Sequence, residues 1–314
     1  MPQPTLAQDR VVDLVYTEVA RGYGHDFAPV SNILFPIVPV NTSAGKIITF
    51  GPEDFIIVNT SRAPGQNTKR IQFGHAGAEF ALNHHRLEAM APLERISETA
   101  VQPGFDLVAR SIRSVQRIMD REREYIGSVL ARTANNYPVG NKSAPTGSDK
   151  WDDPASDPFS QVAAARSAVR KKCGIKPNYM ILGDQVYSAL ARHPGVLDRL
   201  SNADIKVATK AQLELLFEMT IVVGEDVYYE ESTSEFVDMW GNDAIIAVVM
   251  PKSMQEMGSP NFGYTYQLET LPTVEEGYFD KNPNSWIYPV ADAYKPVLTG
   301  MSSGFLIQGA VTLA

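Results

Sequence analysis

The sequence predicts an α+β protein, and three stretches of its 314 residues carry that prediction. Residues 46–82 contain several strand-like runs and are expected to form one long β-hairpin. Residues 103–137 place apolar side chains at helical spacing over an unusually long stretch. Residues 155–250 alternate short helices with apolar strands, as in a compact α/β module. No internal repeat is found.

Composition excludes several classes of protein. The chain is 44% hydrophobic and 20% charged, which is ordinary for a globular protein. No apolar run approaches the roughly 20 residues that a membrane span needs. The opening residues, MPQPTLAQDR, lack the features of a signal peptide. The single cysteine, Cys173, rules out an intrachain disulfide framework and suggests a reducing compartment. We therefore expect no membrane association and no secretory route.

The charge is negative and unevenly distributed. A net charge of −8 argues against sequence-specific recognition of nucleic acid, which needs a basic face. Residues 218–280 hold thirteen acidic side chains and one basic one, Lys252, whereas arginines gather in the long helix. Such blocks are usually solvated faces. The functional alternative is charge complementarity between neighbouring subunits.

The N-terminal region is expected to hold little regular structure. Residues 9–23 predict a short amphipathic helix that Gly22 ends. Residues 27–45 contain several prolines and are expected to be extended and irregular. The apolar positions of the short helix are Val11, Leu14, Val15 and Val19.

The expected hairpin needs support from another surface. Arms of about 13 residues would reach about 40 Å, and an isolated two-stranded hairpin is marginal in water. If the hairpin projects from its own domain, another subunit must support it. Its polar turn, residues 60–69, is the candidate contact region. The candidate interface residues at this tip are Arg62, Pro64, Gly65, Gln66, Lys69 and Arg70.

Residues 75–88, HAGAEFALNHHRLE, hold three of the five histidines. Gly74 and Gly77 favour a strand over a helix, and a strand separates His75 from Glu79 by about 13 Å, too far to chelate one ion. We favour the polar side of a half-buried strand; a pH-sensitive interface and a metal site are the alternatives. One face would carry Ala76, Ala78, Phe80 and Leu82, and the other His75, Glu79, Asn83 and His85, with His84 and His85 pointing oppositely.

The long helix is expected to begin near Pro103 and to run for about 45 Å. No heptad repeat extends beyond it, which argues against a two-stranded coiled coil. Its apolar stripe is Phe105, Val108, Ile112, Val115, Met119, Ile126 and Val129. Its charged face carries Arg110, Arg113, Arg117 and Arg121, which we take as solvated or subunit-contact residues.

Residues 138–158 are rich in Pro, Gly, Ser and Asp and predict a boundary or surface loop. Asp157 is expected to cap a helix that Gly174 closes, and Thr209 to cap another. The remaining elements are strands at 177–183, 219–224, 226–232 and 244–250, a helix at 184–193, and β-like segments at 262–270, 285–298 and 304–313.

The sequence contains no complete catalytic or cofactor-binding motif. The chain has no phosphate-binding loop of the Walker or dinucleotide type and no zinc-protease helix motif. GMSSG, residues 300–304, matches a nucleophile elbow, but the last histidine, His193, precedes Ser302 instead of following it. Cys173 lies at a predicted helix C-terminus, which opposes thiolate formation. We expect no catalytic residue, cofactor or metal.

The order of these elements resembles the major capsid protein of tailed bacteriophages, of the Hong Kong 97 fold. The segment NHHRLEAMAPLERISETA before the long helix carries the resemblance, as does the helix–strand–helix segment at 157–200. The resemblance implies an N-terminal arm (1–40), an extended loop (41–80), a peripheral domain (81–150 and 260–298) and an axial domain (151–259 and 299–314). The spine helix of the peripheral domain would span about 103–135.

The resemblance also implies structural work. Pentamers and hexamers would close into an icosahedral head around double-stranded DNA, which they contact non-specifically, after assembly in the bacterial cytoplasm. The implied partners are a portal, a decoration protein and a scaffolding protein. Because residue 1 opens directly into the arm, we expect the scaffolding protein to be a separate chain or to be absent. Some members crosslink a hairpin lysine to an asparagine. Lys69 and Asn284 lie in comparable places, but no glutamate follows Asn284 at a matching position.

Two alternatives stay open at this point. An encapsulin-type nanocompartment would keep the fold and enclose a cargo enzyme; the loop at 138–158 and the long arm favour a phage capsid instead. A two-domain α/β enzyme with an unrecognised site would be a monomer or small oligomer with a deep pocket.

Overall fold

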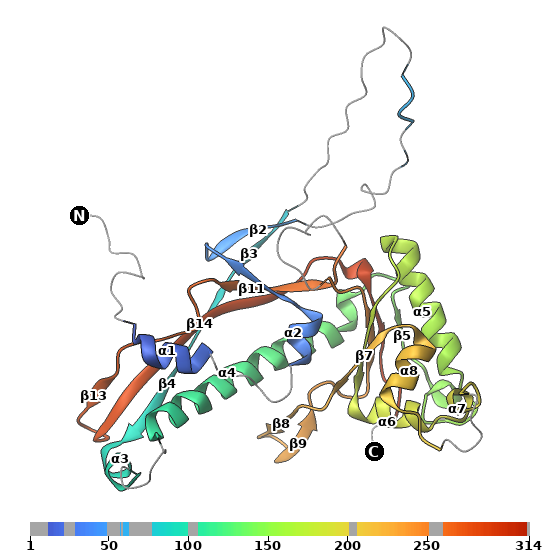
Figure 1. The fold of residues 1–314 in the computed structure, drawn as a ribbon. Coiled ribbons are helices and arrows are strands. Elements are labelled where there is room, and N and C mark those ends of the chain that lie inside the picture. Colours follow the sequence, from blue (N-terminus) through green and yellow to red (C-terminus); the bar gives the residue numbers. More distant parts are fainter. Residues whose placement is uncertain are drawn as a thin grey trace.

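The computed structural model describes residues 12–21, 29–48, 57, 59–62, 77–99, 106–200, 206–250 and 260–312. Figure 1 shows an elongated sheet with a long helix along it, joined at one end to a second body of sheet and helices. Within the described ranges, no helix combines the length and the apolar character needed to cross a membrane.

The first sheet is built around one long strand, β14 (Ser285–Leu298). Its neighbour β4 (Asn83–Pro92) is antiparallel, and all ten of its residues pair with β14. On its other side β14 pairs with β11 (Gly263–Leu268), β12 (Thr273–Val274) and β13 (Tyr278–Asp280). β1 (Ile37–Val40) adds to β11 in parallel. Segments about 200 residues apart in the sequence therefore form one sheet.

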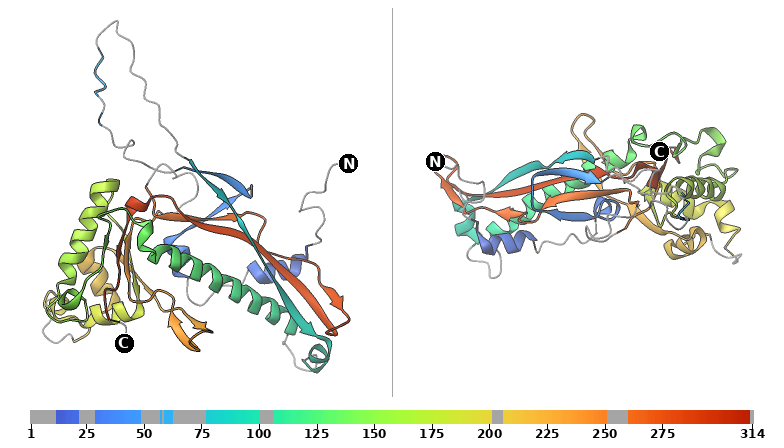
Figure 2. Two further views of the ribbon diagram at one scale, coloured as in Figure 1. Left: turned by 180° about the vertical axis from the view of Figure 1, so that it is seen from behind. Right: turned by 90° about the horizontal axis from the view of Figure 1, so that it is seen from above.

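The spine helix α4 (Leu107–Arg132) begins four residues later than Pro103, the expected start, which itself lies outside the described residues. Asp106 has an extended backbone and accepts hydrogen bonds from the backbone N–H groups of Val108 and Ala109, so it is the N-cap. Figure 2 shows α4 lying along the first sheet. Helix α3 (Leu93–Thr99) precedes it.

The apolar stripe of α4 is confirmed only in its first half. Ile112 and Met119 are fully buried against Ala91 and Val290 of the sheet. Val129, expected on the same stripe, is 47% exposed. In the second half, the buried face of α4 continues through small and polar side chains at helical spacing. These buried residues are Arg123, Glu124, Gly127, Ser128 and Ala131.

The N-terminal region holds more regular structure than expected. Helix α1 (Leu14–Arg21) forms, but Val15 is 71% exposed and does not belong to its buried face. Residues 27–45, expected to be irregular, contain α2 (Val30–Leu34) and β1. The prolines lie at or next to the ends of these elements, which is where their fixed φ and missing N–H are tolerated.

The base of the expected hairpin is confirmed. β2 (Ala44–Ile48) and β3 (Gly77–Ala81) pair in antiparallel register, from Ala44↔Ala81 to Ile48↔Gly77. Between them the structure describes only residues 57 and 59–62. The length of the arms therefore stays a prediction.

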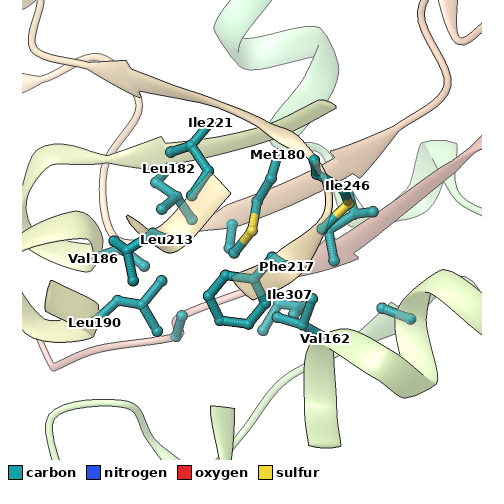
Figure 3. Packing of buried hydrophobic residues seen from close by; sticks show 14 of the residues in the cluster. Val162, Met180, Leu182, Val186, Leu190, Leu213, Phe217, Ile221, Ile246 and Ile307 are labelled. Atoms are coloured by element: carbon teal, nitrogen blue, oxygen red, sulfur yellow. The ribbon is translucent and has the colours of Figure 1, made fainter. Parts of the chain in front are cut away.

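The second sheet has the order β5–β15–β10–β6–β7. Its core joins strand residues such as Met180 and Ile246 to helix residues such as Val162 and Leu213 (Figure 3). The predicted caps are confirmed: Asp157 caps α5, Gly174 closes it in a left-handed conformation, and Thr209 forms a capping box with Gln212. The strands are β5 (Lys142–Ser143), β6 (Tyr179–Gly183), β7 (Thr220–Gly224), β10 (Ala244–Ala247) and β15 (Gly304–Ile307), and the helices are α5 (Pro158–Cys173), α6 (Asp184–Arg192), α7 (Pro194–Leu197) and α8 (Lys210–Phe217).

Residues 138–158 are more than a surface loop. Trp151 is buried in the second core, and its indole donates to Gln161. Asn141 is also fully buried, and its side chain donates to the carbonyl of Gly304. β5, which lies in this segment, pairs with β15, so the segment fastens onto the second sheet.

One hairpin leaves the second body. β8 (Val227–Glu230) and β9 (Glu235–Asp238) pair only with each other in the described structure. Figures 1 and 2 show this hairpin projecting from the second body. The predicted strand at residues 226–232 is thus confirmed as one arm of a hairpin.

Candidate functional site

The C-terminal end of α4 is fixed to the second body by an ion pair. Arg132 Nε lies 2.6 Å from Asp243 Oδ2, and Arg132 Nη1 donates to the carbonyl of Met239 at 2.9 Å. Asp243 is buried, and its other oxygen accepts the backbone N–H of Gly309. Because two hydrogen-bonded partners hold this buried carboxylate, the helix end and the second sheet have a fixed relative position.

A buried glutamate joins three further segments. Glu124 of α4 is 2% exposed; it accepts the indole N–H of Trp240 at 2.7 Å and the backbone N–H of Ser31 at 2.8 Å. Burial raises the pKa of Glu124 to about 7, partly offset by these two hydrogen bonds, and the nearby Asp226 adds to the rise. This carboxyl group therefore ties α2 and the second body to the spine helix.

A second polar cluster lies between α4 and the first sheet. Asp292 of β14 is buried, and each of its carboxylate oxygens lies within hydrogen-bond distance of the side-chain amide nitrogen of Gln267. Burial raises the pKa of Asp292. Arg123 of α4 pairs with Asp120 at 2.7 Å and lies over the ring of Tyr294. The spine helix thus contacts the sheet through polar as well as apolar groups.

The histidine segment belongs to this structural cluster. His85 stacks on the Tyr294 ring with centroids 4.2 Å apart, and its Nδ1 lies 3.3 Å from Glu122. His84 is exposed and His85 is half-buried, so the adjacent histidines point to opposite faces as predicted, but His84 and not His85 lies on the exposed face. Phe80 and Leu82 are buried, again as predicted, while His75 lies outside the described residues. The described part of the chain contains no group of three His, Cys, Asp or Glu that could hold a metal ion.

The residues considered for catalysis have structural roles. Cys173 is buried at the end of α5, and burial raises the pKa of its thiol, which disfavours the nucleophilic thiolate. His193 lies 3.0 Å from Ser156, but it is buried, contacts the carbonyl of Asp153 and accepts the N–H of Gly195 at the start of α7. Ser302 lies in a short 3₁₀ turn, η5 (Met301–Ser303).

The candidate interface residues are only partly described. Arg110, Arg113, Arg117 and Arg121 are all exposed on α4. Arg62 is exposed in the short described part of the hairpin, and Pro64, Gly65, Gln66, Lys69 and Arg70 lie outside the described residues. Asn284 lies in the turn before β14, where its side chain donates to Glu94 of α3. A glutamate therefore contacts Asn284, but it belongs to the upstream helix α3 and does not follow Asn284 in the sequence.

Two exposed apolar surfaces were missed from sequence. On the β8–β9 hairpin, Phe236 is 74% and Tyr229 52% exposed, and their rings meet edge to face at 5.4 Å. On the first sheet, Met90 and Tyr278 are also exposed and share one face, because both pair with Ile287. Strand alternation in DVYYEES could have indicated the first surface, but not whether another element covers it. Exposed apolar surface of this kind is typical of contacts between proteins.

Comparison with known proteins shows the family to which the chain belongs. The family model described as phage major capsid protein E matches residues 59–273. The chain belongs to this family. The major capsid protein of Burkholderia phage BcepMu is 29% identical over 310 residues, which cover 97% of this chain and 98% of that protein. The crystal structure of a phage-related protein from Bordetella bronchiseptica RB50 is 39% identical, covers 96% of this chain and 98% of its own, and superposes with a TM-score of 0.81.

More distant solved structures share the fold alone. The capsid of Myoviridae phage XM1 has a TM-score of 0.54 at 11% identity, covering 91% of this chain and 94% of its own. The SrpI encapsulin of Synechococcus elongatus PCC 7942 has a TM-score of 0.54 at 12% identity, and the match covers 98% of this chain and 96% of the encapsulin chain. These neighbours confirm the expected Hong Kong 97-type α+β fold.

Family membership decides between the alternatives. The phage major capsid protein E family is structural, so the expectations of a phage coat protein and of a non-enzymatic role are confirmed. The encapsulin alternative is less supported, because the matches of higher identity are to phage proteins. As a capsid protein, the chain is a component of the phage virion.

Proposed function

We propose that copies of this chain assemble as pentamers and hexamers into a closed icosahedral phage head that encloses double-stranded DNA. The observation that carries the proposal is that buried polar contacts fix the two bodies of the subunit to each other, while apolar side chains on its surface remain exposed. Arg132–Asp243 and Glu124–Trp240 fix the spine helix to the second body. The exposed rings of Tyr229 and Phe236 are left for a neighbour to cover.

The domain roles follow the same proposal. Residues 1–40 would act as an N-terminal arm and 41–80 as the extended loop, whose base is the β2–β3 pair. The first sheet and α4 would form the peripheral domain (81–150 and 260–298), and the second body the axial domain (151–259 and 299–314). β5 falls within 81–150 but pairs with β15, so the chain between the two domains runs into the axial sheet before residue 150.

The partners in this proposal are further chains and DNA. With a net charge of −8, the shell would contact packaged DNA loosely and without sequence preference, which suits a container that must release its contents. A separate scaffolding protein, a portal and a decoration protein would complete assembly in the host bacterial cytoplasm. A crosslink between Lys69 and Asn284 is not part of the proposal, and denaturing gels of particles should show monomers only.

Deletion of residues 60–69 tests the proposed role of the extended loop. The described part of this segment, residues 60–62, is exposed, so the variant should keep the circular dichroism spectrum and melting temperature of the wild type. It should form no closed shells in electron micrographs. Replacing the same ten residues by a Gly/Ser linker separates the loss of contacts from the change of length. Normal shells from both variants would overturn the intersubunit role of the loop.

A further inference from the structure

The β8–β9 hairpin has two unequal faces. It is held by four residue pairs, from Val227↔Asp238 to Glu230↔Glu235. On the inner face, the Tyr228 ring meets Tyr125 of α4 edge to face, with centroids 5.2 Å apart. Because successive strand residues point to opposite sides, Tyr229 and its partner Phe236 project away from α4. The inner face is therefore occupied within the chain and the outer face is not.

The outer face combines exposed rings with a uniformly negative rim. An isolated two-stranded hairpin with such a face is marginally stable in water, so a partner that covers it would stabilise it. No Lys or Arg occurs between residues 218 and 250, so no basic side chain of its own segment balances the rim. Such a rim repels nucleic acid and attracts a basic protein surface. The exposed acidic residues of the rim are Glu225 and Glu231.

A surface with the matching properties lies on the exposed face of α4. Arg113 and Arg117 point outward there, and Ile118 beside them is 55% exposed. From Arg110 to Arg121 the helix rises about 16 Å, enough to span a short hairpin. Guanidinium groups pair with carboxylates and also stack on aromatic rings, and the hairpin offers both groups.

We propose that the outer face of the β8–β9 hairpin of one copy docks on the Arg110–Arg121 face of α4 in a neighbouring copy. The two faces cannot meet within one chain, because the Tyr228–Tyr125 contact turns the outer face away from its own helix. A contact between two different surfaces of identical chains is head to tail, and such contacts generate rings when they close. This inference rests on the proposed self-assembly and names one interface within it.

Charge reversal tests the pairing. One variant carries Glu225→Arg and Glu231→Arg, a second carries Arg113→Glu and Arg117→Glu, and a third combines all four. Each variant is first shown to keep the wild-type melting profile. Each reversal alone should lower the assembled fraction in sedimentation about tenfold or more, since like charges across an interface cost several kcal/mol. The combined variant should regain a substantial part of the loss.

A disulfide test gives a second readout. Val227→Cys and Ser114→Cys replace exposed residues on the two faces, and the single native cysteine, Cys173, is buried. Oxidised particles of the double variant should give covalent oligomers on non-reducing gels, whereas each single variant should stay monomeric. The proposed contact would be overturned if both charge-reversal variants assembled like the wild type. It would also be overturned if the combined variant regained no assembly and the double-cysteine variant formed no disulfide. Failure of the wild-type chain itself to assemble would overturn the proposed function instead.

Discussion

Glu124 and Trp240 are 116 residues apart in the sequence, yet the indole of Trp240 donates to the Glu124 carboxyl at 2.7 Å in the interior. The same carboxyl accepts the backbone N–H of Ser31. One side chain therefore links the N-terminal segment, the spine helix and the second body. Eight residues further along α4, Arg132 makes another polar link to that body. These two contacts, together with the apolar cluster around Trp240, hold the two bodies in their relative position.

The stability of the subunit should depend on pH through Glu124. Its pKa is about 7 in the folded chain, against 4.5 for a solvated glutamate. The folded state therefore holds a proton between these values that the unfolded state has lost. The resulting stabilisation is complete below about pH 4.5 and is lost as the pH rises through about 7, on the order of 3 kcal/mol in all.

Urea unfolding between pH 4.5 and 8 measures this effect. The wild type should lose stability as the pH rises, and Glu124→Gln should flatten that decline because it removes the titrating group. Burial also raises the pKa of Asp292, which acts in the same direction, so the informative quantity is the difference between the two proteins. Parallel pH profiles would contradict the role given to Glu124.

Arg132→Met should destabilise the subunit by on the order of 3 kcal/mol. The substitution keeps most of the side-chain volume but leaves the buried Asp243 carboxylate without its cationic partner. Chemical denaturation gives the free energy of unfolding. Arg113→Met, which removes an exposed arginine from the same helix, is the control and should change that free energy by less than about 0.5 kcal/mol. Equal effects would show that the ion pair does not fix the helix end.

Gly127→Ala should be destabilising although alanine is the better helix former. In an exposed helix the change would stabilise by about 1 kcal/mol. Here a Cβ at position 127 would lie 2.1 Å from Ser31 Oγ, so α2 would have to move away from α4. Adding Ser31→Gly removes the obstructing side chain and should recover part of the loss in thermal unfolding. A stabilising effect of the single change would mean that α2 does not pack closely here.

Ile112→Asp should prevent folding, whereas Ile118→Asp should not. Ile112 is fully buried beneath α4, and a charge there has no partner, while Ile118 lies on the same helix and is 55% exposed. Soluble yield and melting temperature distinguish the two variants. A soluble Ile112→Asp protein with a wild-type melt would contradict the register of the helix.

Local signals in the sequence predicted the elements well. Asp157, Gly174 and Thr209 mark helix ends through backbone hydrogen bonds that depend only on near neighbours, and all three predictions are confirmed. The β-like segment predicted at 285–298 is confirmed as β14 with the same bounds. The fold class followed from the order of such elements.

Predictions that depended on what covers a surface were less successful. Val129 was placed on the buried stripe by periodicity, but α2 packs on Gly127 and the buried face passes through small residues instead. The exposed rings of Tyr229 and Phe236 were missed because alternation cannot tell which strand face lacks a neighbour. The contact of Glu94 with Asn284 spans 190 residues and has no signal in a single sequence.

Electron microscopy of the expressed chain after size-exclusion chromatography tests the central claim most directly. Closed or tubular shells, or rings of five and six subunits, are the predicted result, and nucleic acid inside native particles would match a phage head. A 34.5 kDa monomer that stays dispersed, even when co-expressed with its scaffolding protein, would contradict assembly as the function of this chain.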